Sequence, residues 1–211
     1  MRRRKKKNIY AFIDSQNLNI STQRLGWKMD WRKFREHLSE KYGVTQAFMF
    51  IGYVPEFEDM YVQLHDAGYM VVLKPTFDMT RPRLEVSEKS SDKEKTEKEE
   101  EKKQTKGNID ADLVLWAMKE LNNYSKAVIV SGDGDFYSLV EYLEAEGKLL
   151  KILAPSGHYS GLYNAYDQYI DRIDQSRKAL AYHDHKKRKR SVVKSNGKWS
   201  KAGITRQGDN R

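Results

Sequence analysis

The stretch VIVSGDGDFYSLV, residues 128–140, joins two different sequence patterns. The apolar run Val128–Val130 is typical of a buried β-strand, and apolar residues then recur at helical spacing from Phe136 onward. Two aspartates, Asp133 and Asp135, and two glycines lie between the two patterns. Because a strand followed by a helix is the repeating unit of parallel α/β sheets, the stretch predicts such a unit with acidic residues at the carboxyl end of its strand.

Five runs along the chain have this strand character. They are Ile9–Ile13, Gln46–Ile51, Tyr69–Lys74, Ala127–Val130 and Leu149–Leu153. Since these runs are apolar throughout and alternate with amphipathic helical segments, we expect an α/β fold. The predicted architecture is a three-layer α/β/α sandwich around a mostly parallel sheet of five or six strands. The aromatic stretch Tyr163–Tyr182 is predicted to be helical and to cover an edge of the sheet.

The charge of the chain is distributed unevenly. The 211 residues carry a net charge of +9, but residues 8–184 hold 23 Lys or Arg against 29 Asp or Glu. The positive charge lies in six basic residues at 1–7 and in ten Lys or Arg, against one Asp, at 185–211. Basic arms of this kind are typical of proteins that bind nucleic acids, although a solubilising tail has the same composition.

A charged insertion and the two basic arms set the expected boundaries. Fourteen of the 19 residues from 85 to 103 are charged, and such a segment buries too little apolar area to join a core. We therefore expect a basic arm at 1–7, a domain at 8–184 with a charged insertion at 85–105, and a basic, disordered tail at 185–211. No apolar stretch approaches the ~20 residues of a membrane span, so no membrane partner is expected.

The chain has no cysteine, which removes disulfides and thiolate chemistry and fits a reducing compartment. A cytoplasmic protein is the expectation. The basic run KKRKR at 186–190 also matches a nuclear localisation signal, which would make the protein nuclear in a eukaryote, but short basic runs match that pattern by chance.

Acidic side chains are predicted to gather at one edge of the sheet. Ligands of parallel sheets bind beyond the carboxyl ends of the strands. Asp14 and Asn17 follow the first strand, and Ser131, Asp133 and Asp135 follow the fourth.

The helix before the fourth strand adds Asp110 and Asp112 in its first turn. Residues two apart on a helix point roughly 200° from each other. Asp110 is therefore expected to face the sheet, and Asp112 ranks behind it. No histidine and no cation except Lys106 is expected at this edge.

Each aspartate also has a purely structural interpretation. Asp110 or Asp112 can complement a helix N-terminus, and Asp135 can cap the helix that starts at Phe136. Asp14 can be a turn residue, with Asn17 capping the segment that follows it.

Several carboxylates converging on one place repel each other unless a cation neutralises them. Ligation by carboxylates without His or Cys indicates a hard ion, Mg²⁺ or Mn²⁺. If the Asp133–Asp135 piece is extended, both side chains lie on one side of it.

The commonest chemistry of such a site is hydrolysis of phosphate esters. With an acidic pocket and basic arms distant from it, a nuclease is favoured over a phosphatase for small molecules. A phosphatase of the haloacid dehalogenase type needs a second acid two residues after its nucleophile, and Gln16 stands there. A dinucleotide-binding domain needs a glycine-rich turn after the first strand, which is missing. A non-catalytic module that binds RNA or a partner protein is the remaining alternative.

Three segments together resemble the NYN domain family, in its LabA-like branch, which belongs to the PIN-like nuclease superfamily. They are NIYAFIDSQNL at 8–18, KGNIDADLVLWAM at 106–118 and AVIVSGDGDFYSLVEYLEAEGKLLKIL at 127–153. The resemblance implies a PIN-like α/β/α fold and a metal-dependent ribonuclease that acts on single-stranded or structured RNA. Many PIN-like domains pair, so the resemblance also allows a homodimer.

The resemblance assigns the site residue by residue. It implies that Asp14, Asp110 and Asp133 bind one or two Mg²⁺ or Mn²⁺ ions, and that Asp135 completes the site directly, through water, or mainly as a helix cap.

Four residues are expected to contact these ligands or the substrate. They are Asn17, Ser131, Asp112 and Lys106. Lys106 either touches the phosphate or lies in a solvated turn. The basic tail residues expected to bind RNA are Lys186, Lys187, Arg188, Lys189 and Arg190.

Overall fold

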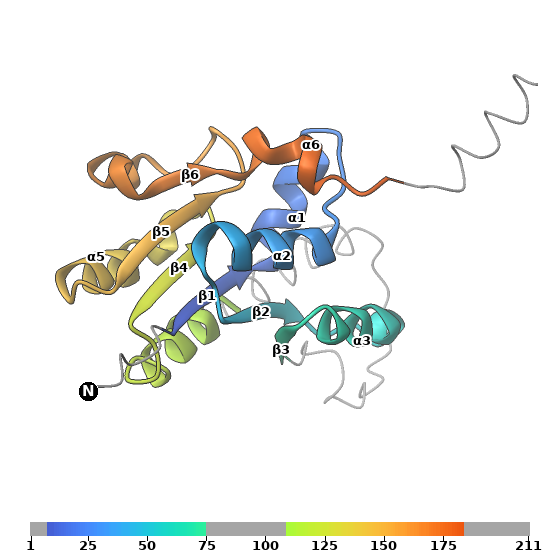
Figure 1. The fold of residues 1–211 in the computed structure, drawn as a ribbon, viewed down its shortest axis with the longest axis horizontal. Coiled ribbons are helices and arrows are strands. Elements are labelled where there is room, and N and C mark those ends of the chain that lie inside the picture. The colour runs from blue at the N-terminus through green and yellow to red at the C-terminus, as the bar shows by residue number, and fades with distance from the viewer. Residues whose placement is uncertain (1–7, 75–108, 184–211) are drawn as a thin grey trace, which may run out of the picture. The chain divides into compact units, whose positions relative to one another are not determined.

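The computed structural model describes residues 8–74 and 109–183. Within these ranges six strands form one sheet in the order β3-β2-β1-β4-β5-β6, and each neighbouring pair is parallel (Figure 1). The strands are Ile9–Asp14 (β1), Gln46–Gly52 (β2), Tyr69–Lys74 (β3), Lys126–Val130 (β4), Leu149–Ala154 (β5) and Ile170–Arg172 (β6). The predicted parallel α/β/α sandwich is confirmed.

The sheet is buried on both faces because its strands alternate between two cores. Along β1, Ala11 and Ile13 enter one core, while Tyr10 and Phe12 enter the other. All four are nearly or fully buried. Two apolar faces require two layers of helices, and this explains why the strand sequences are apolar at almost every position.

Helices from the first part of the chain cover one face. They are α1 (Ser15–Arg24), α2 (Trp31–Tyr42) and α3 (Glu58–Asp66), and the short α6 (Arg177–Leu180) joins them. α2 shows how the sequence sets helix limits. Asp30 caps its first turn by accepting a hydrogen bond from the amide of Lys33, and Gly43 ends it in a left-handed conformation with φ of 69°.

The opposite face is covered by a helix over 109–119 and by α5 (Tyr137–Ala145). Four 3₁₀ segments complete the order of elements. The first follows β2, and the other three lie near the carboxyl edge of the sheet and the end of the domain. They are η1 (Pro55–Phe57), η3 (Gly134–Phe136), η4 (Gly161–Tyr169) and η5 (Ile173–Ser176). None of the helices in the described ranges is long and apolar enough to cross a membrane.

The prediction of a helix over Tyr163–Tyr182 is wrong in most of its length. The segment begins in the 3₁₀ helix η4, contributes the edge strand β6, and ends in η5 and the four-residue α6. Tyr163, Tyr166 and Tyr169 are spaced by three residues, which is the period of a 3₁₀ helix and not the 3.6 of an α-helix.

Several predictions fall outside the described ranges. These are the basic arm at 1–7, the insertion at 85–105, Lys106, and the tail at 185–211 with its basic run at 186–190. The elements from β1 to α6 belong to one compact unit that ends at Ala181.

Candidate functional site at the carboxyl ends of β1 and β4

Strands β1 and β4 are neighbours in the middle of the sheet, and this brings two distant polar segments together. Ile13 on β1 is in register with Val130 on β4. Asp14 and Ser131 are the next residues on each strand, so they leave the sheet side by side. The loop SGDGD therefore lies next to the start of α1, as the strand pattern predicts.

Asp14 is a buried carboxylate with both oxygens hydrogen-bonded. Its side chain is 4% exposed. Oδ1 accepts a hydrogen bond from the amide of Asn17 at 3.0 Å, which makes Asp14 the N-cap of α1. Oδ2 accepts a hydrogen bond from the hydroxyl of Ser131 at 3.1 Å. The alternative in which Asn17 caps this segment is wrong, because Asp14 fills that role and Asn17 lies inside the helix.

Ser131 connects Asp14 to the acidic loop. It is fully buried, and its hydroxyl accepts a hydrogen bond from the amide of Asp133 at 3.1 Å while donating to Asp14. A continuous hydrogen-bonded path therefore runs from the Asp14 carboxylate to the backbone of Asp133. The geometry fixes where the SGDGD loop starts relative to β1.

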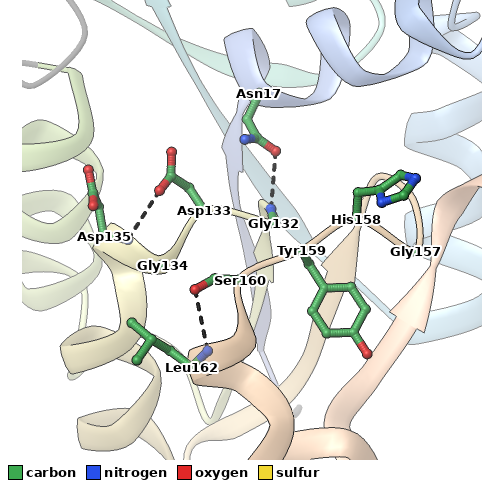
Figure 2. A pocket seen from close by; sticks show the side chains of 10 residues that line it. All are labelled: Asn17, Gly132, Asp133, Gly134, Asp135, Gly157, His158, Tyr159, Ser160 and Leu162. Atoms are coloured by element: carbon green, nitrogen blue, oxygen red, sulfur yellow. Dashed lines mark hydrogen bonds between the residues drawn. The ribbon is translucent and has the colours of Figure 1, made fainter.

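Asn17 holds the same loop from the side of α1. Its side-chain oxygen accepts a hydrogen bond from the amide of Gly132 at 3.1 Å (Figure 2). One turn of α1 therefore presents two contacts to the loop, one through Asp14 and Ser131 and one through Asn17.

Asp133 and Asp135 carry the exposed charge of the site. Asp133 is the N-cap of η3, and its Oδ1 accepts a hydrogen bond from the amide of Asp135 at 3.2 Å. The predicted cap role of Asp135 is thus wrong, since Asp133 performs it. The piece is also not extended, because Gly134 and Asp135 enter a 3₁₀ turn. Figure 2 nevertheless shows both carboxylates projecting to the same side of the loop.

The two aspartates of the 109–119 helix have different surroundings. Asp110 is partly buried, with its Oδ2 atom shielded from solvent. Asp112 forms an ion pair with Lys74 at the end of β3, with Nζ to Oδ2 at 2.8 Å. Lys74 is therefore a cation at the carboxyl edge of the sheet that sequence reasoning missed, and it ties the first turn of the helix to β3.

A pocket of about 650 Å³ opens above the SGDGD loop. Asn17, Asp133 and Asp135 line it, and so does the segment that follows β5. From that segment come Gly157, His158, Tyr159, Ser160 and Leu162 (Figure 2). The expectation that no histidine reaches this edge is wrong, because His158 lines the pocket. The stretch PSGHYSG directly follows a predicted strand, so the rule that identified Asp14 and Asp133 could have found it.

The segment after β5 is hydrogen-bonded to the acidic loop. The amide of Ser160 donates to the carbonyl of Gly132 at 2.9 Å, and the Tyr163 hydroxyl donates to the carbonyl of Asp133. Burial raises the pKa of Tyr163, and the nearby charges of Asp133 and Asp135 raise it further, so this hydroxyl stays protonated as a donor.

Comparison with known proteins identifies the domain. The family model described as NYN domain matches residues 8–180. The chain belongs to the NYN domain family. It is 26% identical over 171 residues to "Low amplitude and bright protein LabA" of Synechococcus elongatus, an alignment that covers 77% of this chain and 82% of the relative. The predicted NYN, LabA-like membership is confirmed.

A solved structure supports the fold. The crystal structure of a protein of unknown function from Vibrio parahaemolyticus aligns with a TM-score of 0.60 at 19% identity. The alignment covers 86% of this chain and all of that chain. The likeness shows that a protein of similar fold has been solved.

The donors of this NYN domain fit a hard divalent cation by type. Asp133, Asp135 and Asn17 offer oxygen ligands to one pocket, and Mg²⁺ prefers oxygen while retaining several waters. Among residues 8–74 and 109–183, however, no group of three or more acidic or histidine side chains is placed to hold one ion. An ion in the pocket would therefore be bound by few protein groups and by water.

Proposed function

We propose that this NYN domain is a metal-dependent ribonuclease that hydrolyses RNA phosphodiester bonds internally. The observation that carries the proposal is the hydrogen-bonded path from Asp14 through Ser131 to Asp133. This path ends at a pocket that is lined by the carboxylates of Asp133 and Asp135. Membership of the NYN family gives the nuclease chemistry its support. The basic segments at 1–7 and 185–211 support a polyanionic substrate.

A bound Mg²⁺ or Mn²⁺ would supply an activated water and neutralise charge on the phosphate. The residues of the chain have separate tasks. Asp133 and Asp135 present carboxylates to the pocket, and Asp110 is proposed to join them. Asp14 is also proposed to bind the ion, and in the structure it is buried and holds Ser131 and the first turn of α1. Asn17 fixes the amide of Gly132, so that the loop keeps its conformation when charge changes around it.

Hydrolysis of this type forms a bond from water oxygen to phosphorus and breaks the bond from phosphorus to the 3′ oxygen. The expected products carry 5′-phosphate and 3′-hydroxyl ends. Mapping the ends of the fragments therefore tests the reaction class separately from its rate.

The deciding experiment compares Asp133→Asn with wild type on end-labelled single-stranded RNA in the presence of Mn²⁺. Removing one pocket carboxylate is expected to lower the cleavage rate by at least about 100-fold. Asp66→Asn is the matched control, because Asp66 is exposed at the end of α3, just before the amino end of β3. Cleavage by Asp133→Asn at the wild-type rate would reject the assignment.

A second function has one observation in its favour. Among the described residues, no three metal-binding side chains form a group. A non-catalytic module that binds RNA or a partner protein needs no such group. This alternative predicts no cleavage of varied RNAs with Mg²⁺ or Mn²⁺. It also predicts RNA binding that survives Asp14→Ala and weakens when residues 185–211 are removed.

The basic run at 186–190 is proposed to bind the RNA backbone. Each neutralised phosphate steepens the dependence of log affinity on log salt, so deletion of 185–211 is expected to flatten that slope. An unchanged slope would remove the tail from the proposal.

A further inference from the structure

The segment after β5, residues 155–163, contacts the acidic loop on the side opposite α1. We name this stretch the clamp segment. Asn17 of α1 and Ser131 of the loop itself accept hydrogen bonds from the amides of Gly132 and Asp133. On the clamp side, the amide of Ser160 and the hydroxyl of Tyr163 bind the carbonyls of those same two residues. The peptide group between Gly132 and Asp133 is thus held at its carbonyl by Ser160 and at its amide by Ser131, and the carbonyl that follows it is held by Tyr163.

The glycines of the loop allow the clamp segment to approach this closely. A Cβ atom at Gly134 would lie 2.5 Å from Ser160 Oγ and 3.2 Å from Leu162 Cδ1. A Cβ at Gly132 would lie 3.3 Å from Tyr159 Cβ. Because real Cβ atoms avoid a distance of 2.5 Å, a side chain at Gly134 would displace the side chain of Ser160 in the clamp. Close backbone approach is therefore a reason for glycine at this position.

Tyr163 is the member of the clamp segment with the clearest connection to the carboxylates. Its side chain is fully buried, and its hydroxyl reaches the backbone of Asp133, one of the two acids that line the pocket. A buried aromatic ring has few rotamers available, so its hydroxyl is a fixed point. Moving the Asp133 carbonyl would also move the Asp133 side chain and the 3₁₀ turn that carries Asp135.

We propose that Tyr163 is a positioning residue: its hydroxyl sets the backbone of Asp133 and thereby the placement of the Asp133 and Asp135 carboxylates. The role of Tyr163 in the reaction rests on the proposed function, while its control of the loop conformation stands on the contacts themselves. Tyr163 acts through Asp133 and needs no contact with substrate.

Tyr163→Phe tests the proposal because it removes one oxygen and keeps the ring. Tyr69→Phe is the matched control. The Tyr69 hydroxyl is also buried and donates to a backbone carbonyl, that of Trp31 at 2.7 Å, but Tyr69 begins β3 at the opposite edge of the sheet. Both variants lose the same kind of bond, so a general loss of stability affects both melting temperatures.

Three measurements separate positioning from stability. Amide hydrogen exchange at residues 132–135 should accelerate in Tyr163→Phe and stay at the wild-type rate in Tyr69→Phe. Mn²⁺ affinity of the protein without RNA should fall only in Tyr163→Phe. The kcat for RNA should fall about tenfold or more with KM changed by less than about threefold, because displaced groups act mainly on the chemical step.

Leu162→Ala is a second variant that avoids the core. Leu162 is 56% exposed, so its truncation is expected to leave the fold intact, yet it removes a clamp side chain that lines the pocket together with Gly134. A smaller change in the same direction is expected.

The outcomes distinguish the two proposals. Wild-type cleavage with unchanged exchange, Mn²⁺ affinity and kcat in Tyr163→Phe would overturn the positioning role and leave the nuclease assignment standing. Absence of cleavage by wild type would reject the nuclease. In that case faster exchange with weaker Mn²⁺ binding in Tyr163→Phe still supports positioning, and no change in either overturns it.

Discussion

The hydroxyl of Ser131 donates a hydrogen bond to the carboxylate of Asp14 at 3.1 Å, across 117 positions of sequence. Burying a carboxylate is costly unless its charge is hydrogen-bonded. Asp14 meets this requirement with Ser131 at one oxygen and the first turn of α1 at the other. The same group therefore caps a helix and anchors the acidic loop, and substitutions can separate these two tasks.

Asp14→Asn should separate helix capping from negative charge. Asparagine caps helices as well as aspartate does, so the free energy of unfolding should stay within about 1 kcal/mol of wild type. Asp14→Ala removes the cap and should cost about 1–2 kcal/mol. Both variants should lose RNA cleavage. Urea unfolding and the cleavage assay measure the two effects.

Asp30 provides the control for this pair, because it caps α2 through the amide of Lys33. Asp30→Ala should cost about 1 kcal/mol of stability and leave cleavage unchanged. If Asp14→Asn cleaves RNA at the rate of wild type, Asp14 is a structural cap only.

Asn17→Ala should weaken the site with a modest effect on the fold. It leaves the amide of Gly132 without its partner, which should cost about 1–3 kcal/mol and lower the cleavage rate. Asn19→Ala is the control on the same helix, because Asn19 is exposed and its side chain accepts a hydrogen bond from the exposed Gln23. Equal cleavage rates for the two variants would contradict a role for Asn17.

Gly134→Ala should force the clamp segment away from the loop. Overpacking of this kind typically costs about 1–3 kcal/mol. Because the nearest obstacle is Ser160 Oγ, the double variant Gly134→Ala with Ser160→Gly should recover part of both stability and cleavage. Gly161→Ala is the control, since its Cβ would meet its nearest neighbour at 3.9 Å. Failure of the second substitution to rescue would place the cause elsewhere.

Asp171 on β6 should make stability depend on pH. Burial raises the pKa of Asp171, but hydrogen bonds from Lys151, Tyr42 and Lys41 outweigh it and hold the pKa below its usual value. A lowered pKa in the folded state means that Asp171 stabilises the fold above the unfolded-state pKa of about 3.9, and that this contribution is lost as pH falls through the folded-state pKa.

Urea unfolding between pH 6 and pH 3 checks this prediction. Asp171→Asn should be less stable than wild type near pH 6, and its stability should fall less steeply toward pH 3. Tyr42→Phe, which removes one donor to Asp171, should give an intermediate slope. Parallel pH profiles for wild type and Asp171→Asn would show that the group does not contribute.

The sequence predicts the central strands well because each is buried on both faces. The five predicted runs match β1 to β5 to within a residue or so at their ends. β6 escapes prediction since its three residues, Ile170–Arg172, show no strand period and follow a 3₁₀ segment rather than a turn. Short edge strands depend on the partner strand more than on their own sequence.

The sequence likewise predicts some features of the site and not others. The meeting of Asp14 with the loop from Ser131 to Asp135 follows from strand ends alone, because carboxyl ends of parallel strands share one edge. The sequence does not determine which aspartate caps η3, since Asp133 and Asp135 are both suitable. The bonds from Ser160 and Tyr163 depend on how β5 and η4 pack, and the pair of Lys74 with Asp112 depends on where β3 ends.

Two parts of the sequence each supply half of the sheet, and they meet at the site. Residues 8–74 supply β1 to β3, and residues 109–183 supply β4 to β6, so the seam between β1 and β4 is where the halves join. Asp14 and Asn17 come from the first half, and Ser131, Asp133 and Tyr163 from the second. Neither half contains a complete site. Two separately expressed fragments, divided within 75–108, would therefore gain the site only by reassociating, and RNA cleavage by their mixture would report that reassembly.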